Sequence, residues 1–212
     1  MTIGDTISGS RQALLAASPR LFRNPLLDRL SRVHHLLPTV VYLPVAILLL
    51  YVADHNMPAI AVAGELMGGY VLWTLLEYFG HRFLFHYHFT STFGRRAQFL
   101  MHGVHHDHPN DPLRLVMPPL MSLPIMTASW VVLRVTLGPL TSMPVLAGLI
   151  IGYLVYDMFH YHLHHAQPKT GIGRFLRIRH MHHHFRDDTV SFGVSAPWWD
   201  YVFGTRASEA RR

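Results

Sequence analysis

The chain has 212 residues, enough for one domain with a buried core, and half of them are hydrophobic while only 14% are charged. Its formal charge of +6 at pH 7 is compatible with nucleic acid, but a basic balance beside long apolar runs is more typical of the cytoplasmic loops of a membrane protein. We therefore expect a membrane protein with no nucleic-acid partner. The sequence contains no cysteine, which excludes disulfides, thiolate metal sites and cysteine catalysis.

Residues 1–35 are the first segment of the chain. They are polar, are interrupted by Pro19 and Pro25, and lack the apolar core that precedes the cleavage site of a secretory signal. Apolar residues are interspersed with arginines, a pattern typical of a segment lying in the membrane interface. We predict an N-terminal interfacial arm with no catalytic role, whose apolar residues are Leu14, Leu15, Leu21, Phe22, Leu26, Leu27 and Leu30.

Four apolar stretches follow, each close to the ~20 residues that cross the hydrocarbon core of a bilayer. The connections within each pair are very short, so we predict an all-α fold of two helical hairpins whose ends return to the same side. Gly64 and Gly68 in the second stretch have the spacing of a close helix approach. The predicted spans are 36–53, 58–80, 115–136 and 142–159, inside a catalytic domain at 36–205 that is followed by a tail at 206–212.

The basic residues give an independent prediction of orientation. Seventeen of the eighteen lysines and arginines lie outside the hairpins on the side to which they return, and Arg134 is the exception. Because lysine and arginine accumulate in cytoplasmic loops, that side is predicted to be cytoplasmic, with both termini and the polar segments on it. The protein is thus expected to be a multi-pass membrane protein.

Ten of the 18 histidines form four clusters just beyond the spans. On a helix, positions i, i+3 and i+4 share one face, so each HX2HH triplet can aim three imidazoles at one point. Residues five apart on an α-helix diverge by about 140°, so the HX4H pair suits two different metals better than one. The clusters are His81 and His86 (HX4H), His102, His105 and His106 (HX2HH), His160 and His164 (HX3H), and His180, His183 and His184 (HX2HH).

The triplets are the specific part of this pattern. In a shuffled chain of this composition one HX4H pair is expected by chance, whereas an HX2HH triplet arises roughly 0.1 times and two arise about one time in a hundred. For any single histidine the alternative is a surface or core residue with a satisfied hydrogen bond. Burying ten imidazoles together without a metal would carry a heavy desolvation cost, so we predict all ten as metal ligands.

Five further residues are candidates for supporting roles. Glu77 lies four residues before His81 and Asp157 three before His160, so both are candidates to orient ligand rings, with simple interfacial exposure as the alternative. His162, His165 and His182 adjoin ligand positions but break the spacing, and each is a candidate proton donor or outer-shell partner. Beyond the metal ligands, no catalytic residue is predicted.

The ligand set limits the metal. Imidazoles without thiolates suit iron, zinc, copper or nickel rather than magnesium or calcium. Ten nitrogens are too many for one ion, whereas two ions with about five each keep open positions, as oxygen activation requires and a closed structural zinc site does not. We therefore predict two metal ions of this class.

Four strings carry a family resemblance: "LLEYFGHRFLFH", "MHGVHHDHPNDPLRLVMPP", "GYLVYDMFHYHLHH" and "RHMHHHFRDDTVSFGVSAPWWDYVFGT". They resemble the fatty acid hydroxylase and sterol desaturase superfamily, and fatty acid 2-hydroxylases in particular, over about residues 18–205. The resemblance implies four spans capped by a cytoplasmic domain in which the ten histidines hold two metal ions. These would be iron in function, with zinc able to replace iron in a structure. The resemblance also implies insertion of a hydroxyl at the carbon next to the acyl carboxyl, using dioxygen and two electrons, on lipid acyl chains such as those of sphingolipids or their precursors.

The electron donor is expected to be a separate protein. Eukaryotic members of the family that this sequence resembles carry an N-terminal cytochrome b5 domain, and the 35 residues before the first span are too few for one. A cytochrome b5-like or ferredoxin-like partner is therefore expected.

Two other functions remain open at this point. Sterol oxidation or desaturation and carotenoid ring hydroxylation share the same histidine pattern, so the spacing does not separate them from acyl hydroxylation. A metal transporter also needs histidines and apolar helices, but transporters hold their ligands near the bilayer midplane, and these clusters lie outside the predicted spans.

Overall fold

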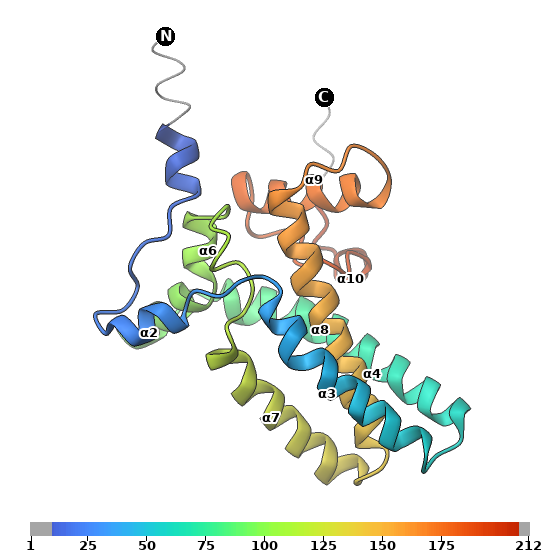
Figure 1. The fold of residues 1–212 in the computed structure, drawn as a ribbon. Helices are drawn as coiled ribbons and strands as arrows, with labels where there is room; N and C mark the ends of the chain where they lie inside the picture. Colours follow the sequence, from blue (N-terminus) through green and yellow to red (C-terminus); the bar gives the residue numbers. More distant parts are fainter. Residues whose placement is uncertain (1–9, 208–212) are drawn as a thin grey trace.

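The computed structural model describes residues 10–207, in which all regular structure is helical, as predicted (Figure 1). Four helices are long and apolar enough to cross a membrane: α3 (Leu37–Asp54), α4 (Ala59–Gly80, continued by η1), α7 (Pro119–Leu137) and α8 (Ser142–His165). The shorter elements are α2 (Pro25–Leu30), η1 (His81–Phe85), α5 (Thr92–Gln98), η2 (Phe99–Gly103), α6 (Val104–Asp107), α9 (Gly171–Phe185) and α10 (Trp198–Val202).

Two of the long helices differ from the predicted spans at their ends. α7 begins at Pro119, four residues later than predicted, because Pro118 is extended and a proline at the first helical position starts the helix. α8 runs to His165, six residues beyond the predicted end, so His160 and His164 lie on the same continuous helix as the apolar span. The span and the histidine pair are therefore one rigid element.

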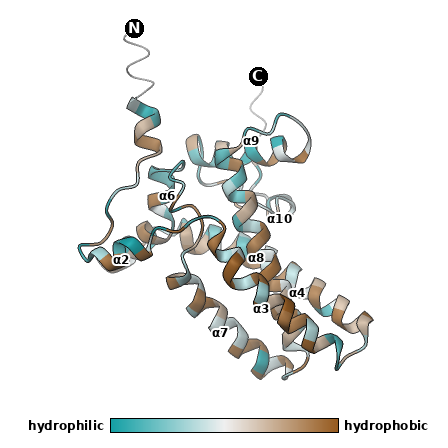
Figure 2. Ribbon diagram, in the orientation of Figure 1, coloured by the Kyte–Doolittle hydropathy of each residue, from teal (hydrophilic) through white to brown (hydrophobic). Residues whose placement is uncertain are grey.

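α8 is the central helix of the bundle. Most of it is buried, by α3, α4 and α7, while those three keep broad apolar surfaces exposed, as helices facing lipid do (Figure 2). Glycines allow α4 and α8 to touch: a Cβ on Gly148 would lie 2.0 Å from the Leu66 carbonyl oxygen, and one on Gly69 2.0 Å from that of Val145. The prediction of a close approach at Gly64 and Gly68 is wrong, because a Cβ at either position would meet open space.

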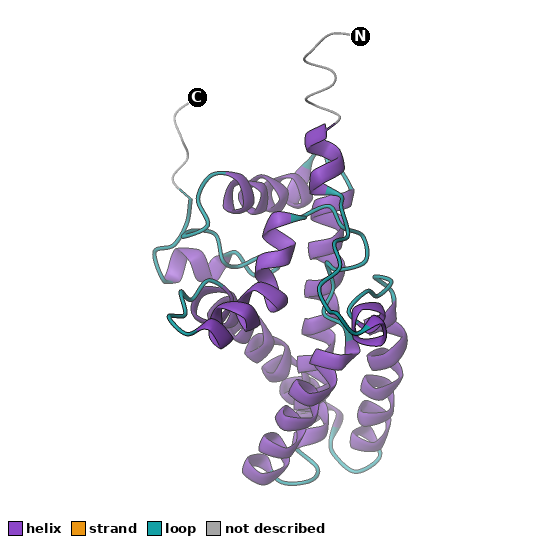
Figure 3. Cartoon of the chain, turned by 90° about the vertical axis from the view of Figure 1, so that its left-hand side faces the viewer, coloured by secondary structure: helices purple, strands orange, loops and turns teal. Residues whose placement is uncertain are grey.

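The long helices and the histidine-bearing elements occupy different ends of the molecule. The connections at 55–58 and 138–141 lie together at one end, and η1, η2, α6, α9 and α10 gather at the other (Figures 1 and 3). α9 lies across that end, on the side farthest from the two connections. The four histidine clusters, far apart in the sequence, are thereby brought to one region.

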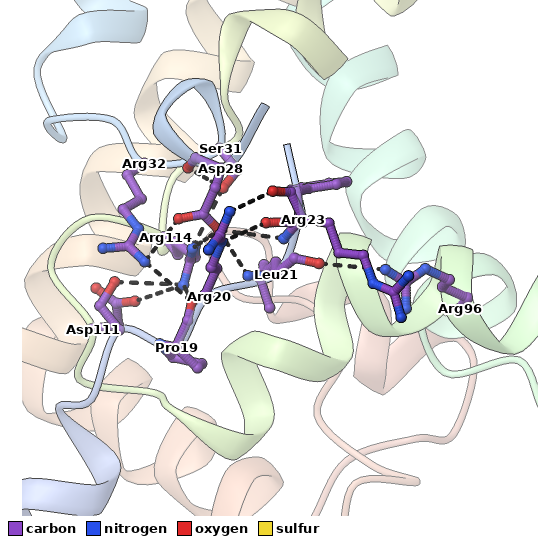
Figure 4. Close-up of polar contacts among 12 residues, drawn as sticks. Pro19, Arg20, Leu21, Arg23, Asp28, Ser31, Arg32, Arg96, Asp111 and Arg114 are labelled. Carbon is purple, nitrogen blue, oxygen red and sulfur yellow. Dashed lines mark hydrogen bonds and ion pairs between the residues drawn. The ribbon is translucent and has the colours of Figure 1, made fainter. Parts of the chain in front are cut away.

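The N-terminal arm crosses the edge of this region. The Asn24 side chain caps α2 by accepting from the backbone N–H of Leu26, 2.9 Å away. Leu26 and Leu30 are exposed, while Asp28 points inward to an ion pair with Arg114 (Figure 4). The parts of the predicted arm and tail at 1–9 and 208–212 lie outside the described residues.

Candidate metal centre

The ten histidines of the four clusters converge into two groups of five. Within each group every residue offers one ligand atom, and these atoms all lie within 4.8 Å of one another. Seven of the ten rings are buried and the others are partly so. We call them the first group (His81, His86, His102, His106 and His183) and the second group (His105, His160, His164, His180 and His184).

The spacing of the ring nitrogens fits a metal ion in each group. In the first group, His81 Nε2 lies 3.2 Å from the Nε2 atoms of His86 and His102. In the second, His164 Nε2 lies 2.7 Å from His180 Nε2. Nitrogens bound at right angles on an ion with 2.0–2.1 Å bonds lie about 3 Å apart, so these contacts have the length of an edge of a coordination polyhedron.

His81 and His86 belong to the same group, contrary to the prediction that they suit two different metals. The prediction assumed an α-helix, but η1 is a π-helix, in which the backbone N–H of His86 donates to the carbonyl of His81 at 3.2 Å. One turn of a π-helix spans five residues between donor and acceptor, which places i and i+5 on one face. The wider turn thus replaces the usual i, i+4 spacing.

The two HX2HH triplets are divided between the groups, so the prediction that each aims at one point is wrong. Positions i and i+4 of each triplet stay together: His102 and His106 in the first group, His180 and His184 in the second. The middle member crosses over, since His105 Nε2 lies 3.0 Å from His184 Nε2. His183 crosses in the opposite sense, 3.0 Å from His86 Nε2. Each group thus consists of one histidine pair, two members of one triplet and one member of the other.

Burial keeps the imidazoles outside the spanning helices neutral. It lowers the pKa of His86 to about 4 and, reinforced by neighbouring imidazoles, the pKa of His106 to about 2. The pKa values of His105 and His180 are also held well below the usual range by burial and by adjacent rings. Neutral imidazoles carry the lone pair that a metal needs, so each group is ready to bind a cation at neutral pH.

A loop between α9 and α10 orients two rings of the first group. Nδ1–H of His81 donates to the Phe192 carbonyl at 2.6 Å, and Nδ1–H of His183 donates to the Val190 carbonyl at 2.8 Å. These bonds assign the proton to Nδ1 and leave Nε2 free to face the centre of the group. Sequence reasoning missed this loop because the acceptors are backbone carbonyls, which any residue carries.

The two candidate carboxylates are buried, and neither is simply exposed at the interface. The Glu77 carboxylate accepts from both the backbone N–H (2.7 Å) and the hydroxyl of Ser195, so it holds the same loop. Asp157 lines a cavity beside His160. Glu77 therefore acts on the surroundings of the rings through the loop.

The three neighbouring histidines lie outside both groups. His162 and His165 are on the exposed side of α8, where His165 packs against Tyr161 with a ring separation of 4.3 Å. His182 is partly exposed on the outer side of α9. No contact of these rings in the described chain favours a proton-donor role.

A cavity of about 110 Å³ opens onto both groups. His102 of the first group and His105 and His160 of the second line its inner part. Its remaining lining is mostly apolar and comes from the arm, η2 and the start of α7, including Leu21, Phe22, Leu100, Met101, Met117 and Met121. An apolar chain can therefore approach the imidazoles from the side of the long helices.

The sequence profile of the fatty acid hydroxylase family matches residues 66–205, a stretch that includes all ten histidines. The chain belongs to this family. A solved structure described as full-length scs7p, with only its hydroxylase domain visible, superposes with a TM-score of 0.83 at 34% identity, covering 89% of this chain and 72% of that one. The fold of this fatty acid hydroxylase is thus shared with a solved hydroxylase domain.

Two curated relatives illustrate the likeness. The chain is 39% identical to the dihydroceramide fatty acyl 2-hydroxylase FAH2 of Arabidopsis thaliana, over 88% of this chain and 79% of that protein. It is 37% identical to the fatty acid 2-hydroxylase of Homo sapiens, over 72% of this chain and 42% of that protein. The match to the human protein therefore spans less than half of that protein's length.

Proposed function

We propose that this fatty acid hydroxylase inserts a hydroxyl group at the carbon next to the carboxyl of a lipid acyl chain, including the chains of sphingolipids or their precursors. The observation that carries the proposal is the pair of five-imidazole groups lining one mostly apolar cavity. The 2-hydroxylase names of its relatives support the position of attack.

The residues fit two ions of the iron or zinc class, one in each group, because each offers five neutral nitrogens and no sulfur. When bound, two iron ions supply the activation of dioxygen, so that RH, O₂, two electrons and two protons give ROH and water. Five ligands leave room for a sixth on each ion. The chain's own contribution is to hold the imidazole rings in place and to limit which molecules reach them.

Three features of the chain suit an acyl substrate. The cavity walls beside the imidazoles are mostly apolar and can accept methylene groups. The elements that carry the histidines gather at one end of the long helices (Figure 1), so a chain with its tail in hydrocarbon would meet the imidazoles at its head-group end. This arrangement favours oxidation near the carboxyl over attack in mid-chain.

We extend the proposal to orientation and boundaries. The distribution of lysine and arginine favours a cytoplasmic metal centre and two cytoplasmic termini. The catalytic domain would extend over residues 36–205, with the arm at 1–35 and the tail at 206–212 outside it.

Electrons would enter through the outer face of α9. That face exposes Ile178 (57%) and Phe185 (45%) beside the exposed cations Arg174 and Arg186. The opposite face of the same helix carries the buried ligands His180 and His183, so a carrier docked outside is separated from both groups by one helix. An apolar centre with a cationic rim suits a small acidic electron carrier, cytochrome b5-like or ferredoxin-like.

Lipid analysis tests the proposal. The full chain is produced in cells that make no 2-hydroxylated lipids, together with a reductase and carrier, and its lipids are fragmented by mass spectrometry. We expect one added oxygen on acyl chains, at the carbon next to the carboxyl, and none with His105→Ala at matched membrane abundance. Oxygenated sterols or carotenoids in place of acyl chains would reject acyl hydroxylation in favour of another activity of the superfamily.

A further inference from the structure

Among the described residues, the polar contacts of the loop at 188–196 with the histidines are with rings of the first group. Its carbonyls at Val190 and Phe192 accept from His183 and His81. The Asp188 carboxylate lies 3.7 Å from His86 Nδ1. In the described chain, by contrast, the Nδ1 atoms of three second-group rings have no hydrogen-bond partner: His164, His180 and His184. A residue that holds this loop in place therefore affects the first group and its metal ion, and not the second.

Asp200 on α10 fixes the loop at Phe192 and Gly193, whereas Glu77 holds it at Ser195. The Asp200 side chain is fully buried (0% exposed), and its two oxygens accept from consecutive backbone N–H groups, those of Phe192 (2.9 Å) and Gly193 (3.1 Å). The Thr205 hydroxyl donates to Oδ1 at 2.9 Å, and the Arg179 guanidinium lies 3.5 Å from Oδ2. Burying a carboxylate is costly, and these donors offset the cost only while the loop keeps this position.

Phe192 connects Asp200 to the first group of histidines. Its N–H is held by Asp200, and its carbonyl accepts from His81 Nδ1 at 2.6 Å. A carboxylate that orients a metal-binding histidine usually accepts directly from the imidazole. Here the backbone of Phe192 lies between the carboxylate and the ring, so Asp200 acts on His81 indirectly.

A chain of hydrogen bonds ties the same carboxylate to the helix that carries His81. The Arg82 guanidinium donates to the Tyr78 hydroxyl at 2.9 Å, and that hydroxyl lies 2.8 Å from Thr205 Oγ1, which donates to Asp200. Tyr78 is on α4 and Arg82 on η1, one residue after His81. The segment that carries His81 and the loop that carries its acceptor, the Phe192 carbonyl, are therefore both linked to Asp200.

We propose that Asp200 is a positioning residue for one metal ion only: through the backbone of Phe192 it fixes the His81 ring and sets the affinity of the first group, leaving the second group unaffected. The proposal rests on the metal-binding role under "Proposed function". Its consequence is that the two groups differ in affinity, although each has five imidazoles.

Asp200→Asn is the informative variant. An amide keeps one acceptor oxygen, but its NH₂ would meet the N–H of either Phe192 or Gly193, donor against donor. The negative charge facing Arg179 is lost as well. Substituting residues that orient metal-binding histidines typically weakens metal binding by about 10–100-fold, and we expect a loss in that range for the first group.

The test measures zinc bound per chain by the full-length protein in detergent, with zinc alone as the probe. His164→Ala removes one of the five ligands of the second group and is expected to weaken it, so that the tightest remaining site is the first group. We expect one tightly bound zinc in His164→Ala and binding about 10–100-fold weaker in His164→Ala with Asp200→Asn. With His86→Ala in place of His164→Ala, the tightest remaining site is the second group, and Asp200→Asn should leave its affinity unchanged.

Asp28→Asn is the matched control. Asp28 also accepts from two consecutive backbone N–H groups, those of Leu21 (2.7 Å) and Phe22 (3.3 Å), and pairs with an arginine, but it lies on the arm. In the His164→Ala background it should leave the zinc affinity unchanged. If Asp200→Asn does not fold, Thr205→Val removes one donor to the carboxylate and should weaken the first group in the same direction.

The outcomes separate the two proposals. Suppose that the native chain binds two zinc ions and that Asp200→Asn and Thr205→Val weaken both groups equally, or weaken neither. That result would overturn the role of Asp200 and leave the proposed function standing. A native chain that binds no zinc or iron would remove the metal centre itself. Selective weakening of the first group supports the positioning role.

Discussion

His183 and His184 are neighbours in the sequence but belong to different groups: His183 Nε2 lies 3.0 Å from His86 Nε2, whereas His184 Nε2 lies 3.0 Å from His105 Nε2. Adjacent residues on a helix point about 100° apart, so consecutive histidines on α9 can face different groups. The crossing of His105 and His183 thus interlocks the groups, so that each draws ligands from η2–α6 and from α9.

The crossing predicts how ligand substitutions combine. His183→Ala with His86→Ala removes two ligands from the same group, so one bound metal ion should remain per chain. His184→Ala with His86→Ala removes one ligand from each group, so neither group stays intact and no ion should bind with native affinity. Metal quantification on purified protein distinguishes them, with His88→Ala as a control outside both groups. Equal loss from the two double variants would contradict the assignment.

Acid should destabilise the metal-free protein. Burial lowers the pKa of His86 to about 4 and of His106 to about 2, whereas an unfolded histidine titrates near 6.5. Below about pH 6.5 the unfolded state therefore binds more protons than the folded state. The stability that these neutral rings contribute is complete above that pH and is lost as the pH falls toward their pKa values in the folded protein. Thermal unfolding of chelator-treated protein at about pH 8 and about pH 5 should give the lower midpoint in acid. An unchanged midpoint would mean that the rings are not held neutral.

The arm should loosen when Arg114 is replaced. The Arg114 guanidinium pairs with Asp28 at 3.2 Å and also donates to the Pro19 carbonyl, which ties the arm to the segment before α7 (Figure 4). Arg114→Met keeps the apolar stem and removes these bonds. Trypsin should then cleave the arm, at Arg20 or Arg23, several times faster than in the native protein.

Arg134→Met, at the far end of α7, is the control and should leave the cleavage rate unchanged. Cleavage at the native rate in Arg114→Met would show that other contacts hold the arm. The His108 ring, 2.7 Å from the Leu14 carbonyl, provides one such contact.

Charge reversal on α9 tests the route of electrons. Arg174→Glu with Arg186→Glu should slow reduction of the iron-loaded enzyme by an acidic carrier about 10-fold or more at low salt, with the difference shrinking as salt rises. Stopped-flow reduction with the soluble domain of cytochrome b5 or with ferredoxin measures this. Reduction by dithionite should be equal in the two proteins. If each carrier reduces the variant as fast as it reduces the native protein, this face of α9 is excluded as the docking site of the carrier.

The fold and the convergence of the ten histidines could be predicted from sequence because both depend on strong, local patterns. Apolar length identifies the four spans, and ten imidazoles at helical spacings identify the residues that the structure brings together. The arrangement within the set could not be predicted. The pairing of His81 with His86 depends on a π turn, and the division of the triplets depends on how η2–α6 and α9 approach each other.

The support of the rings was harder still to predict. Asp200 acts through the carbonyl of Phe192, which is more than 100 residues from His81 in sequence. Every residue has a backbone carbonyl, so such an acceptor cannot be recognised from the residue type. One signal was present: an acidic residue within the aromatic run "PWWDYVF" is costly to bury unless it has fixed partners. The same argument identified Glu77 but not its partner, Ser195.

Anomalous diffraction from crystals of the iron- or zinc-loaded protein tests the central claim most directly, because it locates the ions without reference to activity. Two anomalous peaks are expected, one within about 2.0–2.3 Å of five ring nitrogens of the first group and the other at the same distance from five of the second. A single peak shared by both groups, or peaks away from the ten imidazoles, would contradict the two-ion centre.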